Sequence, residues 1–223
     1  AVADGRIIAV GSATDMAAFR GVDTVDSNLD GHTLSPGFVD GHVHVANLGM
    51  QAVGANLLAE PDGDVATIDD LVQKLQEFAE GDDIDRTGWI FGVGYDDSIL
   101  VEKRHPTRDD LDRVSTELPV IATHISGHFA AVNSKGLELV GYDADTADPE
   151  GGIIRRRPGT QEPNGVLEEL AAIPVLMAAI TPKTLENSHF FMRRGLELAM
   201  SYGYTTAQEG RAVTPTHDSL AEF

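Results

Sequence analysis

The sequence predicts an α/β protein, in which a short β-rich segment precedes a larger domain of strands and helices. Three observations support this fold class. Residues 1–35 contain short strand-like stretches separated by Asp-Gly turns. An apolar run that begins at Phe38 follows a Pro-Gly turn, as expected for the first strand of a new domain. Beyond this run, helical periodicity alternates with short apolar stretches along most of the chain.

Turn residues define the strands predicted in the first segment. Asp4-Gly5 predicts a tight hairpin turn, and Asp30-Gly31 predicts a second turn. Short strands are predicted at residues 2–3, 6–10, 22–26 and 33–34. Together they fit a partial β-sandwich domain over residues 1–35, and the alternative is an unrelated β-meander.

The main domain, residues 36–223, has its clearest predicted helix at residues 67–79. Apolar residues recur there with helical spacing, and the N-cap Thr67 is followed by Asp69 and Asp70 in the first turn. Buried strands are predicted at residues 38–44, 88–95, 119–123 and 204–208. Helical stretches are predicted from Thr107, at 133–139, 165–180 and 182–202, and from Ala212, with a loop or hairpin at 148–165.

Composition limits the partners that this chain can take. Of its 223 residues, 36 are acidic and 16 basic, giving a net charge of −20, which disfavours binding to nucleic acid and to anionic membrane surfaces. There is no apolar run long enough for a transmembrane helix and no leader pattern, so a cytoplasmic location is expected. The chain has no cysteine, so a metal ion must be bound by His, Asp, Glu or a modified Lys.

Two histidines at the end of the strand predicted at residues 38–44 are the strongest candidates for metal ligands. In a β-strand, residues two positions apart face the same side, so His42 and His44 can reach one ion. Asp40 lies close enough to help position them. Zinc, manganese and iron all accept such ligands. The alternative is that the two imidazoles are packed or hydrogen-bonded in a core.

Further motifs follow in order along the chain, and together they identify a family. They lie at residues 3–11, 34–44, 89–96, 105–112, 119–120 with 124–128, 133–134, 148–152, 165–169 and 203–209. With these motifs the chain resembles the amidohydrolase superfamily, and within it amidohydrolase family 3, the N-substituted formamide deformylase-like group. The resemblance implies the N-terminal part of a (β/α)8 TIM barrel, with residues 204–208 as the second barrel strand and a long insertion at about 45–200.

The resemblance also implies a chemistry. His42 and His44 would bind one or two divalent ions, with zinc as the first choice, and activated water would hydrolyse an amide-type carbon–nitrogen bond outside peptides. The remaining ligands and the general-base aspartate are expected beyond residue 223. The resemblance therefore implies a fragment, completed by the rest of its own barrel or by a homo-oligomer, that acts on a small-molecule substrate.

Other polar residues are weaker candidates. Within the family resemblance, Glu169 and Asp40 are candidates for metal ligands or for residues that orient the ligands. Exposure on a helix is the alternative for Glu169. His124, His128, Tyr95 and Asp96 are candidates for the substrate pocket, and a structural turn is the alternative for the two histidines.

Two residues at the end of the strand predicted at 204–208 point towards the barrel mouth. They are Gln208 and Glu209, and we expect that they could orient a ligand. Two other functions remain open for the chain: a catalytically incomplete fragment and a metal-binding module without hydrolysis. The choice between an amidase and a deaminase also remains open.

Overall fold

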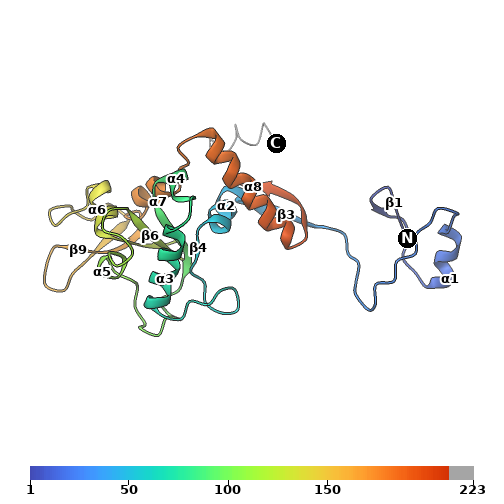
Figure 1. Cartoon of the computed structure of the whole chain (residues 1–223), viewed down its shortest axis with the longest axis horizontal. Helices are drawn as coiled ribbons and strands as arrows, with labels where there is room; N and C mark the ends of the chain where they lie inside the picture. Colours follow the sequence, from blue (N-terminus) through green and yellow to red (C-terminus); the bar gives the residue numbers. More distant parts are fainter. Residues whose placement is uncertain (211–223) are drawn as a thin grey trace.

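The computed structural model describes residues 1–210 and confirms a mixed α/β fold. The predicted N-terminal hairpin is present: β1 (Val2–Ala3) pairs with β2 (Arg6–Ile7) in antiparallel fashion. Asp4 and Gly5 turn the chain with φ values of 50° and 71°. Two short helices follow, α1 (Ala13–Met16) and η1 (Ala17–Phe19). An extended stretch then joins this segment to the rest of the molecule, from which it lies apart (Figure 1).

The strands predicted at residues 22–26 and 33–34 are wrong. Val22 is 101% exposed and Val25 is 84% exposed, so neither side chain packs against a second sheet. A strand also needs a neighbour to accept its backbone hydrogen bonds, and within residues 1–37 only β1 and β2 pair. The partial β-sandwich over residues 1–35 is not confirmed by the pairing of β1 with β2 alone, and it stays a prediction.

The first strand of the main domain pairs with a strand far away in the sequence. β3 (Phe38–Val43) lies parallel to β10 (Tyr204–Glu209), and their assignment as the first two strands of a barrel stays a prediction. α2 (Val45–Val53) follows β3 directly, and α8 (Leu185–Ser201) leads into β10. A complete eight-stranded barrel stays a prediction.

The two helices α2 and α8 pack with their backbones in close approach. Gly49 of α2 and Gly195 of α8 lie at this crossing. A Cβ atom on Gly49 would come within 2.0 Å of the Phe191 carbonyl oxygen, and one on Gly195 would come within 2.4 Å of the Val45 oxygen. The contact therefore needs glycine on both helices, and it fixes the helix that begins just after the two histidines.

The predicted insertion folds around a six-stranded mixed sheet in the order β4-β5-β6-β7-β9-β8. Its strands are β4 (Ala55–Asn56), β5 (Ile90–Tyr95), β6 (Val120–His124), β7 (Phe129–Val132), β8 (Gly152–Arg156) and β9 (Pro163–Glu169). Its helices are α3 (Ile68–Ala79), α4 (Ile84–Thr87), α5 (Arg108–Leu111), α6 (Ser134–Val140) and α7 (Ile173–Ile180). The first three strands run parallel, and the other three pair in antiparallel fashion.

A separate apolar core covers each face of this sheet. Because side chains alternate along β5, Ile90 packs with Leu71 and Leu75 of α3 on one face. Phe91 packs on the other face with Val175 of α7 and Phe191 of α8. The second core reaches α8, so it links the insertion to the helix that precedes β10.

Local signals located several elements correctly. The N-cap Thr67 accepts a hydrogen bond from the Asp70 backbone N–H, and Asp70 accepts one from the Thr67 backbone N–H, which confirms the helix start. Asn133 caps α6 in a similar way. The helix predicted from Ala212 lies outside the described residues.

The helix predicted over residues 165–180 is wrong in its first part. Residues 163–169 form β9, which pairs with β7 and β8, and the helix begins only at Ile173. Gly165 has a φ of 97° and lies so close to β7 that a Cβ would come within 2.5 Å of the Val132 oxygen. Pairing with two strands outweighs the local helical pattern here. None of the helices in residues 1–210 is long and apolar enough to cross a membrane.

Candidate functional site

The two histidines of the His-x-His motif lie side by side at the carboxyl end of β3. The ring centroids of His42 and His44 are 5.2 Å apart, and the ring planes meet at 79°. His42 is exposed, and the His44 side chain is 41% exposed. The Asp40 carboxylate accepts a hydrogen bond from the backbone N–H of His42 at 3.0 Å. Asp40 therefore contacts the backbone of the motif.

A carboxylate from β10 contacts the second histidine. Glu209 Oε1 lies 3.2 Å from His44 Nδ1, and Glu209 Oε2 accepts a hydrogen bond from the Val45 backbone N–H at 2.8 Å. The Glu209 side chain is only 7% exposed. Parallel pairing of β10 with β3 places Glu209 opposite Val43, next to the motif.

The residues around the motif suit a divalent metal ion. With Nδ1 of His44 held by Glu209, Nε2 is the ring nitrogen left to bind an ion, and a second imidazole stands next to it. Gly210 lies against the other ring, where a Cβ would come within 2.7 Å of His42 Nε2. Two neutral imidazoles are typical zinc ligands, and they supply half of a four-coordinate site.

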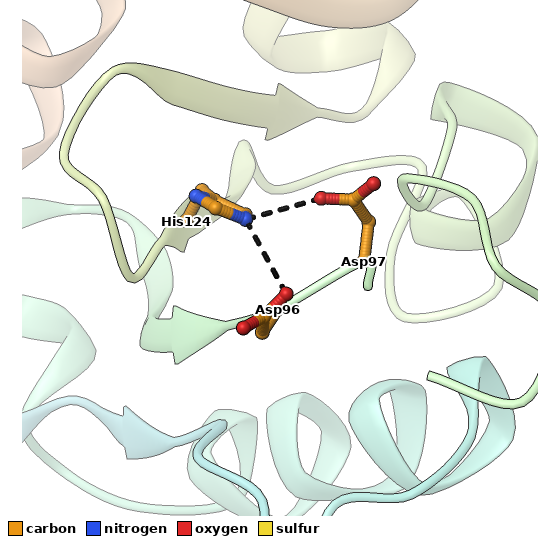
Figure 2. Close-up of side chains that lie close together, drawn as sticks. All are labelled: Asp96, Asp97 and His124. Carbon is orange, nitrogen blue, oxygen red and sulfur yellow. Dashed lines mark ion pairs between the residues drawn. The ribbon is translucent and has the colours of Figure 1, made fainter. Parts of the chain in front are cut away.

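A second group of metal-type ligands lies in the insertion, at the ends of β5 and β6. Figure 2 shows Asp96, Asp97 and His124 facing one another, and one potential ligand atom from each lies within 4.8 Å of the others. His124 Nε2 is 3.1 Å from Asp97 Oδ1 and 3.9 Å from Asp96 Oδ1. Asp97 was missed by sequence reasoning, although an Asp pair directly after a buried strand could have marked it.

The His124 ring is held by hydrogen bonds at Nδ1. Its side chain is 10% exposed, and Nδ1 accepts a hydrogen bond from the Ser126 backbone N–H at 3.1 Å. A neutral ring that accepts at Nδ1 carries its proton on Nε2, which then faces Asp97. Nε2 of His124 is buried and makes no hydrogen bond, although Asp97 Oδ1 lies 3.1 Å away from it.

An aromatic layer surrounds this group. The Tyr95 hydroxyl lies 2.9 Å from His105 Nδ1, and the His105 ring stacks on Phe129 with centroids 4.9 Å apart. Burial lowers the pKa of His105 below its usual 6.5, and burial together with Asp97 raises the pKa of Tyr95. Both groups are therefore neutral near pH 7.

The remaining carboxylates have structural partners. The Ser98 hydroxyl donates to Asp96 and lowers the pKa of that carboxyl group. Glu169, at the end of β9, lies 3.0 Å from Nδ1 of His128, and both side chains are more than half exposed. Glu169 lies on a strand end, so its expected alternative position on a helix surface is wrong.

An apolar pocket of about 350 Å³ lies between α2, α7 and the strands β5 and β6. Its apolar walls include Met50, Phe91, Ile121, Phe129, Leu176 and Ile180. Its polar residues are Asn47, Gln51, Thr123 and His124. Among the lining residues in the described part of the chain, His124 is the only titratable one. Of the four residues predicted for the substrate pocket, His124 lines this pocket. The other three, Tyr95, Asp96 and His128, are not among its lining residues.

Known proteins are similar to this chain over most of its length. The Amidohydrolase family matches residues 27–222. Protein LONG AFTER FAR-RED 3 of Arabidopsis thaliana is 30% identical over 99% of this chain and 36% of its own length. N-substituted formamide deformylase of Arthrobacter pascens is 32% identical over 77% of this chain and 30% of its own length. The chain thus spans about a third of the curated relatives that it matches.

A solved structure shares the fold. An uncharacterized metal-dependent hydrolase from Pyrococcus horikoshii superposes with a TM-score of 0.57 at 23% identity. The match covers 83% of this chain and 33% of that protein. At this level of identity the likeness extends to the fold alone.

Proposed function

Because the chain belongs to the amidohydrolase family, we propose that it forms part of a metal-dependent hydrolase of amide-type carbon–nitrogen bonds outside peptides. The observation that carries the proposal is the pair His42 and His44 at the carboxyl end of β3, with their rings 5.2 Å apart beside the parallel strand β10. The carboxyl ends of parallel strands are where catalytic groups gather in barrel enzymes.

The two imidazoles would hold a divalent ion, with zinc as the first choice. When bound, such an ion lowers the pKa of water to about 7 and polarises a carbonyl group. In this proposal His42 and His44 bind through ring nitrogens, and Glu209 orients the second ring. Residues 36–223 would be the start of the barrel, and residues 1–35 would belong to a smaller β domain.

The pocket beside α2 supports a neutral, partly apolar small-molecule substrate. Its walls are mainly apolar, and it contains no Asp, Glu, Lys or Arg among its lining residues in residues 1–210. Since α2 begins directly after His44, the pocket wall is joined to the proposed metal strand. The pocket would seat the part of the substrate that does not react and would exclude water around it.

The experiment that tests the proposal is elemental analysis of the purified protein and two double variants. We expect one or two divalent ions per chain in the wild type, and we expect His42→Ala/His44→Ala to lose them. Asp96→Asn/Asp97→Asn is the matched control, because it disrupts the one group of three or more metal-type ligands that lie together within residues 1–210. Loss of metal in the Asp variant alone would indicate that the metal binds at Asp96 and Asp97 in the insertion, and it would contradict the proposal.

An activity assay on the metal-loaded protein tests the bond type. Neutral N-substituted formamides and acetamides should release an amine, and this release should disappear in His42→Ala/His44→Ala. Release of ammonia from a ring amino group instead would indicate a deaminase. Bound metal without hydrolysis of any C–N substrate would favour the metal-binding module.

A further inference from the structure

We propose that Glu209 is the positioning residue of the metal site: it holds the His44 ring so that Nε2 faces the ion. This role rests on the proposed function, because it concerns the same pair of histidines. Glu209 comes from β10, 165 residues away from His44 in the sequence. Parallel pairing of β10 with β3 is what brings its carboxylate to the motif.

One oxygen of the Glu209 carboxylate contacts the His44 ring. Glu209 Oε1 lies 3.2 Å from His44 Nδ1. An ionised carboxylate can only accept hydrogen bonds, so this contact requires the proton of the imidazole to be on Nδ1. The lone pair of a neutral ring is then on Nε2. Without Glu209, the imidazole is free to carry its proton on either nitrogen.

The other oxygen of the carboxylate contacts the start of α2. Glu209 Oε2 accepts a hydrogen bond of 2.8 Å from the backbone N–H of Val45, the first residue of α2. The N-cap residue of this helix, His44, makes no side-chain cap of its own. Glu209 therefore satisfies one of the free donors at the helix start, where a negative charge is favourable. With both oxygens engaged, the carboxylate has little rotational freedom.

The carboxylate is more deeply buried than the ring that it contacts. The Glu209 side chain is 7% exposed, whereas the His44 side chain is 41% exposed. The carboxylate thus lies beneath the ring, and the exposed side of the ring is available to an ion. Burying a carboxylate costs free energy unless its oxygens are paired, so the contacts with the His44 ring and the Val45 N–H are needed to keep Glu209 in this position.

Two variants and a control test this role. Glu209→Gln keeps the size of the side chain but leaves a single acceptor oxygen for two donors, and Glu209→Ala removes both. Mutation of a residue that hydrogen-bonds to a metal-bound histidine typically lowers the metal affinity by about 10- to 100-fold. We expect the dissociation constant for Zn²⁺, measured by competition with a chelator, to rise about 10-fold in Glu209→Gln and about 100-fold in Glu209→Ala. Glu197→Gln, at an exposed position of α8 where the carboxylate pairs with Arg194, should leave it unchanged.

A second measurement does not depend on the variants folding. In metal-free wild-type protein, ¹⁵N chemical shifts of the His44 ring should report a proton on Nδ1. A proton on Nε2 would overturn the role of Glu209 by itself, and so would wild-type affinity in both Glu209 variants. A wild-type protein that binds no metal at His42 and His44 would overturn the proposed function, and this role with it.

Discussion

Gly49→Ala is expected to disturb the packing that holds the start of α2 in place. Gly49 is buried in the contact between α2 and α8. A Cβ atom at this position would lie 2.0 Å from the carbonyl oxygen of Phe191 and 2.6 Å from its carbonyl carbon. Both atoms belong to the backbone of α8, so no side-chain rotation can make room.

The expected loss in the free energy of unfolding follows from the overlap between this Cβ atom and the α8 backbone. Ordinary contact begins near 3.4 Å, so the two helices must separate by about 1.4 Å. Overpacking a core costs about 1–3 kcal/mol, and a rigid backbone contact belongs at the upper end. Alanine regains about 1 kcal/mol in helix propensity over glycine. We therefore expect the free energy of unfolding to fall by about 2 kcal/mol.

Urea unfolding followed by circular dichroism measures this change. Gly81→Ala is the control, because its Cβ would lie at an ordinary 3.4 Å from the nearest atom. Since His44 directly precedes α2, Gly49→Ala should also weaken zinc binding in a chelator competition assay. If Gly49→Ala is as stable as the wild type, the close approach of the two helices is refuted.

Two further predictions concern the insertion. Burial lowers the pKa of His105 below 6.5, so the unfolded state binds the proton more readily. The contribution of neutral His105 to stability is therefore constant above about pH 6.5 and is lost as the pH falls through the folded pKa. In urea unfolding at pH 7 and pH 5, we expect the free energy of unfolding to change less with pH in His105→Gln than in the wild type. The same change with pH in both proteins would contradict the burial of a neutral His105. Leu176→Trp should fill the apolar pocket and raise the KM of a substrate with a bulky apolar group about 10-fold, with kcat and the KM of a small substrate nearly unchanged. Equal KM values for the bulky substrate in the two proteins would exclude the pocket as its binding site.

Local sequence signals were sufficient where short-range contacts decide the structure. Thr67 and Asp70 cap the same helix start, three residues apart, so the pattern alone predicted α3. His42 and His44 are two residues apart on a strand, and their side-by-side arrangement follows from the alternation of side chains. Asp4-Gly5 likewise predicted the first hairpin.

The sequence misled where pairing with distant strands decides the structure. Residues 165–169 carry a helical pattern, yet they form part of β9 because β7 and β8 supply hydrogen bonds on both sides. Residues 22–26 carry a strand pattern, yet they remain unpaired because the strands within residues 1–37, β1 and β2, pair only with each other. A strand is stable only with its partners, so its local pattern is not sufficient.

The sequence by itself determined the fold class, the family and the two histidines proposed to bind metal. Only the tertiary structure decided that Glu209 lies beneath His44, and that Asp97 and Asp96 face His124. These contacts join segments brought together by the pairing of β3 with β10 and of β5 with β6. The physical reason is that a short motif specifies its own geometry, whereas the partner of a buried or half-buried polar group is set by the packing of the whole chain.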